Sequence, residues 1–324
     1  MRKLFALLAV SGSLVFLSGC MVDAAATRGH FDRTLKVSGA VDLDVQSGAG
    51  DIAVRTGGSG TVVVHARIYA SHWNAGDIEH RVHYLESHPQ IEQNGNTIRV
   101  GHTNDRDLMH NISISYEVIV PAETKLHASS GSGDERIDGM HGPVDASSGS
   151  GHVTLSHIGS QATAHTGSGD IDLNSVHGNV KAGTGSGSIH ATGIAGGFSA
   201  STGSGDVRLE QTAPGKVNIG TGSGSIEIRG ANGAVDAHTG SGNIAAQGQP
   251  KGDWTLHTAS GSLNVTFPGT AAYDLVAHTG SGGIHIRHTI EFNGKWMPHN
   301  VQGKVGGGGP AVDLNTSSGS IRID

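Results

Sequence analysis

The stretch AHTGSGDIDL, residues 164–173, carries the pattern that decides the fold of this chain. Its TGSG core recurs downstream in TGSGSIHA (184–191), TGSGDVRL (202–209), TGSGSIEI (221–228), TGSGNIAA (239–246) and TGSGGIHI (279–286). With looser copies included, the first residue of each corner is Gly131, Gly149, Gly167, Gly185, Gly203, Gly222, Gly240, Ala259, Gly280 or Ser317. The steps are 18 or 19 residues until the last two, of 21 and 37. One structural unit is therefore copied many times, and the last step has room for an extra or enlarged coil.

Apolar residues alternate on both sides of each corner. Val180 and Ala182 precede the corner at Gly185, and Ile189 and Ala191 follow it. A period of two indicates short strands with one buried face, and the repeat shows no helical period. Two strands and two corners per unit predict an all-β fold: a parallel β-solenoid, similar to a single-stranded β-helix, with coils of about 18 residues stacked about 4.8 Å apart.

The glycine-rich corner has three candidate roles. As architecture, glycine permits a sharp turn, and the Ser or Thr before it can bond to corner amides. A phosphate cradle would need a helix after the loop, whereas a strand follows here. A calcium-binding β-helix repeat would place Asp where Ile171 stands, and the adjacent acidic column of Asp134, Asp170 and Asp206 is interrupted. The pattern favours architecture and leaves calcium as an alternative.

The first twenty residues resemble an export signal for a lipoprotein. Arg2 and Lys3 precede an apolar run that is short for a membrane span. The run ends in LSGC, which resembles the lipobox of bacterial lipoproteins, and Cys20 is the only cysteine in the chain. Lipidation at Cys20 would give an otherwise unpaired thiol a role and would anchor the protein in a membrane. Met21 stands where inner-membrane retention usually needs Asp, so we expect an outer-membrane lipoprotein, on a face that the sequence leaves open.

Composition narrows the class of partner. The chain has 324 residues and 52 glycines, but only 4% of its residues are aromatic, so a conventional core of large side chains is not expected. Without residues 1–19, 19 basic residues face 28 acidic ones, a net charge of about −9. Nucleic acid is not an expected partner, because phosphate binding needs a basic surface.

Residues 35–127 are strand-like but less regular than the repeat. VDLDVQSGAGDIAVRT contains an early echo of the corner, and ISISYEVIVPAETKLHASSGSGD leads into the regular coils. We predict a signal peptide at 1–19, a lipidated N-terminus and linker at 20–34, an irregular β cap at 35–127, and solenoid repeats with a C-terminal cap at 128–324. Solenoids need such atypical ends.

These segments together resemble the bacterial putative-adhesin domain family. The resemblance rests on the GAGDI opening, the long strands, the SGSGDIDL-type coils and the closing GKVGGGGPAVDLNTSSGSIRI. It covers nearly all of the chain after the signal. It implies a β-strand repeat fold and an adhesin-like role, and it brings no catalytic residues with it.

Histidine is the unusual residue, with 21 copies, all beyond the signal. His238, His257 and His278 share one outward column, and sequence order predicts that they lie on consecutive coils about 5 Å apart. Imidazoles at that spacing could converge on Zn²⁺, Cu²⁺ or Ni²⁺, although histidine is also a tolerated polar residue on a sheet surface. Apart from this divalent metal and the lipid, we expect no cofactor. So many histidines could also tune association between about pH 5 and 7.

The sequence therefore predicts a non-catalytic, lipid-anchored β-solenoid of the cell envelope that binds or scaffolds an envelope or cell-surface protein or glycan. One alternative is a periplasm-facing lipoprotein of envelope stress sensing or maintenance. Another is a carbohydrate-active β-helix enzyme that would use outward carboxylates such as Asp170, Asp172 and Asp206. Few aromatic platforms for sugar rings accompany those carboxylates.

Overall fold

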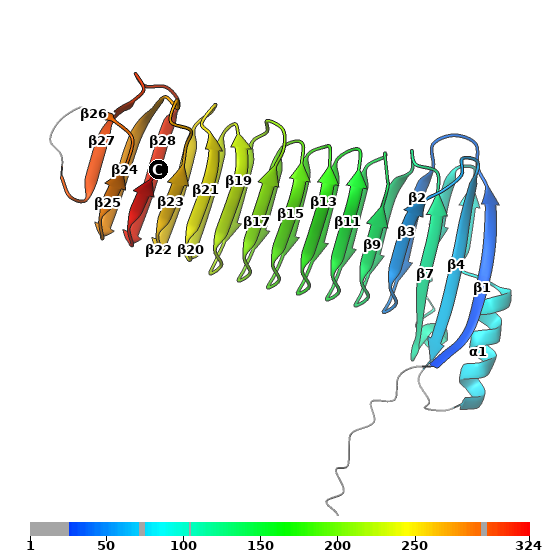
Figure 1. Cartoon of the computed structure of the whole chain (residues 1–324). Coiled ribbons are helices and arrows are strands. Elements are labelled where there is room, and N and C mark those ends of the chain that lie inside the picture. Colours follow the sequence, from blue (N-terminus) through cyan, green and yellow to red (C-terminus); the bar gives the residue numbers. More distant parts are fainter. Residues whose placement is uncertain (1–25, 71–74, 104, 293–296) are drawn as a thin grey trace, which may run out of the picture.

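Two long β-sheets face each other along a rod in the computed structural model, which describes residues 26–70, 75–103, 105–292 and 297–324 (Figure 1). Each coil gives one strand to each sheet, as the period of two predicts. Neighbouring coils pair in parallel and in register, so that Val144 lies beside Ala162 and Ala162 beside Val180. The predicted parallel β-solenoid is confirmed.

Eleven coils form the rod within the described residues. In spatial order from the N-terminal end, their strands in one sheet are β3 (Ile52–Thr56), β9 (Glu135–Asp138), β11 (Val153–Ile158), β13 (Ile171–Val176), β15 (Ile189–Ile194), β17 (Val207–Gln211), β19 (Ile226–Asn232), β21 (Ile244–Gln249), β23 (Leu263–Thr266), β29 (Ile321–Ile323) and β25 (Ile284–Ile286). Their partners in the other sheet are β2 (Asp42–Ser47), β8 (Lys125–Ser130), β10 (Val144–Ser148), β12 (Ala162–Thr166), β14 (Val180–Thr184), β16 (Phe198–Thr202), β18 (Val217–Thr221), β20 (Val235–Ser241), β22 (Trp254–Ser260), β28 (Ala311–Ser318) and β24 (Tyr273–Ser281).

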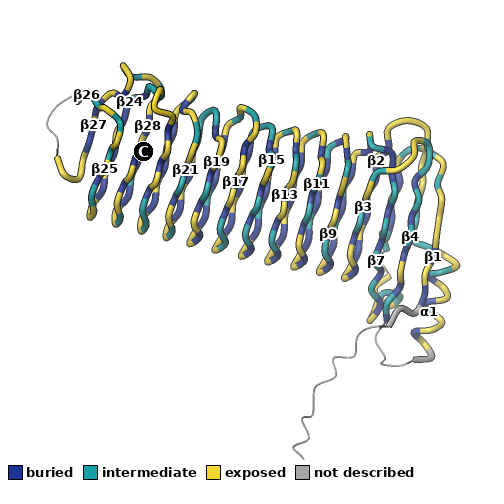
Figure 2. The backbone as a smooth tube through the Cα atoms, in the orientation of Figure 1, coloured by how far each residue is buried: buried dark blue, intermediate teal, exposed yellow. Residues whose placement is uncertain are grey.

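The core is a narrow stripe between the two sheets. Alternate residues on each strand are buried, which gives the banded pattern along every coil in Figure 2. Ile171 and Leu173 point inward from β13, and Ala162 and Ala164 point inward from β12. The small alanines on one sheet let the two sheets approach over the larger side chains of the other.

The second corner of several coils needs a left-handed backbone. Gly139 and Gly193 occupy it with φ of 79° and 71°, while His157 and Ser175 adopt φ of 53° and 57° at the same position. The left-handed region is costly for side chains other than glycine. This corner therefore accepts strain in two of its copies.

The N-terminal end is capped by elements outside the repeat. The strands β7 (Ile112–Val120), β4 (Thr61–Ala70) and β1 (Ala26–Lys36) extend one sheet, and β6 (Thr97–Val100) and β5 (Ile91–Asn94) extend the other. The helix α1 (Ala75–Ser87) places Ile78, Val82 and Leu85 in the core, and α2 (Arg106–Met109) is a single turn. Neither helix is long and apolar enough to cross a membrane.

The predicted boundary at residue 127 does not coincide with the end of the rod. β2 and β3, which lie inside the predicted cap, pair in parallel with β8 and β9 and form the first coil. The long cap insertion, residues 57–124, separates this coil from the next one in sequence but not in space. Its helix α1 was also not expected from a region interpreted as strands.

The C-terminal end departs from sequence order. The last coil, β28 and β29, lies between β22–β23 and β24–β25, as the red strands of Figure 1 show. A hairpin of β26 (Ile290–Phe292) and β27 (Asn300–Val305) then covers the outer edge of β24 with antiparallel pairing. The 37-residue step before the last corner is long enough to carry the chain out and back.

Candidate functional site

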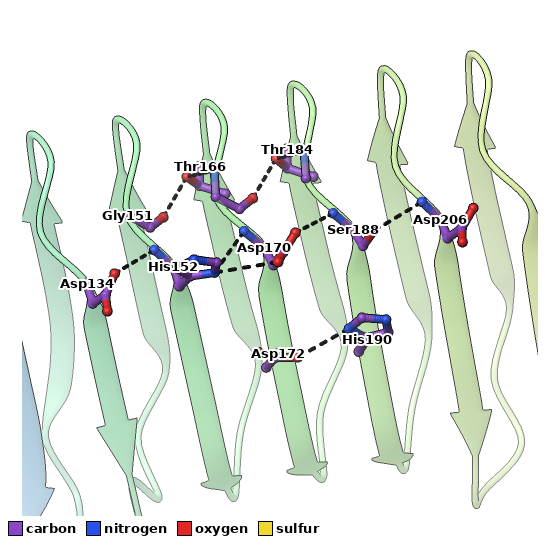
Figure 3. Close-up of polar contacts among 12 residues, drawn as sticks. Asp134, Gly151, His152, Thr166, Asp170, Asp172, Thr184, Ser188, His190 and Asp206 are labelled. Carbon is purple, nitrogen blue, oxygen red and sulfur yellow. Dashed lines mark hydrogen bonds and ion pairs between the residues drawn. The ribbon is translucent and has the colours of Figure 1, made fainter. Parts of the chain in front are cut away.

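The buried hydroxyl column joins each corner to the one before it. The Oγ1 of Thr166 donates to the carbonyl of Gly151 in the preceding coil at 2.9 Å and accepts from the amide of Gly169 in its own coil at 3.2 Å (Figure 3). The same position is buried from Ser47 to Thr316. A bond between the hydroxyl and a corner amide, as predicted for Ser and Thr, is present up to Thr221, but the amide belongs to the same coil. The bond to the preceding coil's carbonyl was not predicted, and it continues to Thr316.

A second polar ladder runs along the outside of the same corners. The Oδ1 of Asp134 accepts from the amide of His152 at 3.0 Å, and the Nδ1 of His152 accepts from the amide of Asp170 at 3.2 Å. The Oδ1 of Asp170 accepts from the amide of Ser188 at 2.8 Å, and the Oγ of Ser188 accepts from the amide of Asp206 at 3.3 Å (Figure 3). Side chains therefore occupy the corner amides that a phosphate would need.

The acidic members of this ladder do not gather into a cation cage. Asp134, Asp170 and Asp206 alternate with His152 and Ser188, so a whole coil separates each of these three carboxylates from the next. Asp51 lies on the coil directly before Asp134, whose amide it accepts from at 3.0 Å. Within the described residues no group of three or more His, Cys, Asp or Glu side chains is placed to hold a metal ion. The geometry supports the architectural interpretation of the corner.

The glycines of the corner are required by close stacking. A Cβ added to Gly151 would lie 2.0 Å from the carbonyl oxygen of Gly133, and one on Gly169 would lie 2.1 Å from that of Gly151. Real Cβ atoms do not approach a backbone oxygen so closely, so any side chain here would force the coils apart. The GSG sequence therefore recurs because neighbouring coils are in contact at these glycines.

The histidine column is not the consecutive triplet that sequence order predicts. His238 and His257 are register partners on β20 and β22, but Asn315 of β28 lies between His257 and His278. The ring of His238 also lies over Gly220, on the side away from His257, because a Cβ on Gly220 would meet its Nε2 at 2.6 Å. The structure thus separates His278 from the pair, because the last coil is inserted there.

Outward charges pair across neighbouring coils. The Nδ1 of His190 lies 3.4 Å from the Oδ1 of Asp172 (Figure 3). The Nε2 of the same ring lies 2.9 Å from the Nη1 of Arg208. Arg208 also contacts Asp206 and Glu227, each at 3.6 Å. Asp172 and Asp206 therefore belong to ion pairs two coils apart, and Asp170 belongs to the corner ladder. The three carboxylates do not converge on one reacting position.

One buried carboxyl escaped the sequence interpretation. Glu135 occupies an inward position that Ile52 and Val153 fill in the neighbouring coils, and it is fully buried. Neither of its carboxylate oxygens has a hydrogen-bond partner within the described part of the chain. Burial raises the pKa of the Glu135 carboxyl to about 8. The sequence did contain a signal for this buried carboxyl, because Glu135 is the one polar residue in the column of apolar residues four positions after the corner glycine.

Cys20 and the linker up to residue 25 lie outside the described residues. The lipidation site therefore stays a prediction of the sequence. The first described strand, β1, lies at the capped end of the rod (Figure 1). An anchor attached there would be joined to the cap and not to the C-terminal coils.

Comparison with known families adds to this geometry. The model of the Toastrack DUF4097 family matches residues 86–324, most of the chain. This chain belongs to the Toastrack DUF4097 family. The match spans the inner and C-terminal coils and part of the cap, and it confirms the β-repeat family resemblance drawn from the corner motifs. A Toastrack chain is thus built here from stacked coils and a mixed cap.

Two solved structures resemble this Toastrack chain over most of their length. One is a putative cell adhesion protein from Clostridium sporogenes, 11% identical, with 91% of this chain and 98% of that chain covered and a TM-score of 0.23. The other is a putative adhesin from Bacteroides fragilis, 14% identical, with 92% and 98% covered and a TM-score of 0.33. No curated protein has a matching sequence.

Proposed function

We propose that this protein is a non-catalytic, adhesin-like binding module of the bacterial envelope, anchored to the outer membrane through a lipid on Cys20. The observation that carries the proposal is the saturation of the rod by its own bonds. Corner amides, buried hydroxyls and some outward charges, such as Asp172 with His190, are engaged in holding coil to coil. What remains for function is a long, rigid and regular surface, which suits presentation to a protein or glycan.

The lipid anchor and the rod divide the work in this proposal. The apolar run before Cys20 supports export and lipidation, and the acyl chains would hold the cap end at the membrane. The eleven coils would then project the outer faces away from the anchor. The names of the two structural neighbours, a putative adhesin and a putative cell adhesion protein, agree with such a role.

The test is site-specific photo-crosslinking in intact envelopes of cells that express the full chain. A photoreactive residue at Ser199 reports on one face, and one at Arg208 reports on the opposite face, because both side chains are exposed on strands of different sheets. Cross-links from one face to one protein or glycan would support the proposal. Cross-links only to copies of the chain and to lipid would contradict it and favour a spacer or maintenance role.

Cys20→Ser is the matched control for the anchor. We expect the lipidated chain to sediment with outer membranes and the Cys20→Ser chain to appear in the soluble fraction. Equal distribution of the two chains would contradict the anchoring part of the proposal. The cross-linking result would still decide the binding part.

A further inference from the structure

The corner stack ends abruptly at the first coil. β7 covers β3 in parallel register, and β6 covers β2 in the same way, so both strands of the first coil have a neighbour on the N-terminal side. The corner between them is covered on one side only. The chain turns away at Gly101, whose φ of 78° places it against the carbonyl of Gln46, and it returns to β7 only after α2. The start of β7 covers one side of this corner, since the Oγ of Ser47 donates to the carbonyl of Ile114 at 2.8 Å and a Cβ on Gly50 would lie 2.2 Å from the same oxygen. The other side, at Gly48, has no covering segment among the described residues.

The surroundings of Gly48 show that this side of the corner is open. At the next two corners a Cβ on Gly131 would lie 2.2 Å from Gly48, and one on Gly149 would lie 2.3 Å from Gly131, both measured to the carbonyl oxygen. A Cβ on Gly48 would meet nothing within 4 Å. The amide of Gly131 bonds to Ser47 at 2.9 Å, whereas the amide of Gly48 has no acceptor among the described residues. An open space thus adjoins the first corner.

This open space is a cavity of about 710 Å³. Its volume is within the usual range of small-ligand sites. Its walls come from the first corner, from β4, from the start of β7 and from the α2 segment. The α2 segment is held in place by Arg81, whose Nη1 donates to the carbonyls of Asp107 and His110, both at 2.8 Å. Asp105 caps the same turn by accepting from the amide of Leu108 at 2.9 Å. Arg81 and Asp105 thus position the α2 wall of the cavity.

The lining combines one aromatic face, mixed hydrogen-bonding groups, one cation and one carboxylate, Asp105, which is engaged by the amide of Leu108. Tyr69 offers a partly exposed ring, while Gln46, Thr103 and Asn111 both donate and accept hydrogen bonds. Asn111 also holds a left-handed φ of 62°, a strain that is common at binding sites. Arg106 is exposed, and none of the ion pairs among the described residues involves it.

We propose that this cavity binds a carboxylate-bearing saccharide. Sugar hydroxyls donate and accept, as do the amide and hydroxyl groups of the lining, and a sugar ring can stack on Tyr69. Arg106 would bind the carboxylate in a chain that is otherwise acidic. A glycine-rich peptide turn would replace only the missing corner and would leave Arg106 and Tyr69 without matching groups. The inference rests on the proposed binding function and assigns its ligand class.

Isothermal titration of the full chain in detergent tests the assignment. The probes are oligogalacturonate, the uncharged oligosaccharides of cellulose and chitin, and a peptide of sequence SGSGD. Oligogalacturonate should bind most tightly. Gly48→Trp should weaken that binding by about tenfold or more, because the new ring fills the cavity. The matched control is Gly58→Trp, since a Cβ at Gly58 also meets nothing within 4 Å but lies outside the cavity.

Arg106→Gln separates charge from shape. It should lower the affinity for oligogalacturonate by about tenfold and leave uncharged oligosaccharides almost unaffected. The assignment would be overturned by no saccharide binding, by equal binding to Gly48→Trp, or by binding of the peptide alone. Envelope cross-links from the coil faces that persist in Gly48→Trp would show that the general binding function survives such a failure.

Discussion

The inner coils, residues 144–249, and the coils after residue 250 share one repeat, yet they stack by different rules. In the inner coils a connection of a few residues places each coil on its predecessor, so β10, β12, β14 and β16 follow sequence order. After β25 the chain makes a longer connection through β26 and β27. It then returns so that β28 lies between β22 and β24, which belong to coils that are consecutive in sequence. A repeat therefore specifies how coils pair, and the connection length specifies which coils pair.

The largest test of this contrast is at the inserted coil. Leu314 is fully buried, and its register partners are Leu256 on one side and Ala277 on the other. Leu314→Ala should cost about 3 kcal/mol, because a cavity opens in the core. Hydrogen exchange should rise in β24 and β27 as well as in β28. Leu155→Ala, in the inner coils, is the control and should leave exchange at the C-terminal end unchanged.

Corner packing gives the next effect in size. Gly169→Ala puts a Cβ 2.1 Å from the Gly151 oxygen, so we expect a loss of about 2–3 kcal/mol as the coils shift. Gly48→Ala places its Cβ in open space and should leave the denaturation midpoint unchanged. Chemical denaturation of both variants measures the difference. Equal midpoints would mean that the stack is looser than its glycine contacts indicate.

Replacing Glu135 should increase stability, in contrast to the two preceding substitutions. The folded chain holds the Glu135 proton up to about pH 8, whereas the unfolded chain releases it near the ordinary carboxyl pKa of 4.5. Wild-type stability therefore falls as pH rises between these values. Glu135→Ile should stabilise the protein by about 2 kcal/mol at about pH 9 and by less at about pH 5. Thermal melts at both pH values measure this. A gain that does not depend on pH would argue against a buried carboxyl.

The smallest expected change concerns a single hydroxyl of the buried column. Thr166→Val keeps the shape but removes the bonds to Gly151 and Gly169, which should cost about 1–2 kcal/mol. The control is Thr163→Val, three residues earlier on the outer face of β12. The Thr163 side chain makes no such bonds, so this change should alter stability by less than about 0.5 kcal/mol. If both variants melt alike, the buried column contributes little beyond packing.

The repeat was predictable because every coil meets the same neighbours. The buried position of Thr166 and the inward side chains of Ile171 and Leu173 follow from the period alone. The separation of His278 from His257 was not predictable, because coil order depends on a return of the chain that no local pattern encodes. α1 was missed because Ile78, Val82 and Leu85 form a short helical stripe inside a region rich in strands.

The candidate binding site was less visible in sequence than the rod. Tyr69, Arg106 and Gln46 lie far apart in the chain and meet only because the cap insertion folds back over the first coil. The echo GAGD at residues 48–51 marked that coil, but a vacancy beside it is a property of what precedes it in space. Neither the composition nor the period of the repeat could therefore predict the open space beside the first corner.

The inserted last coil also sets an order of events in folding. Up to β23 the rod can grow one coil at a time as the chain emerges, since each new coil docks on a finished one. β24 cannot take its final place until residues 311–323 are available, because its parallel neighbour is β28 and not β22. Sequential growth therefore gives way to a concerted closing step, and a chain stalled before that step would present the unpaired edge of β22 to other molecules.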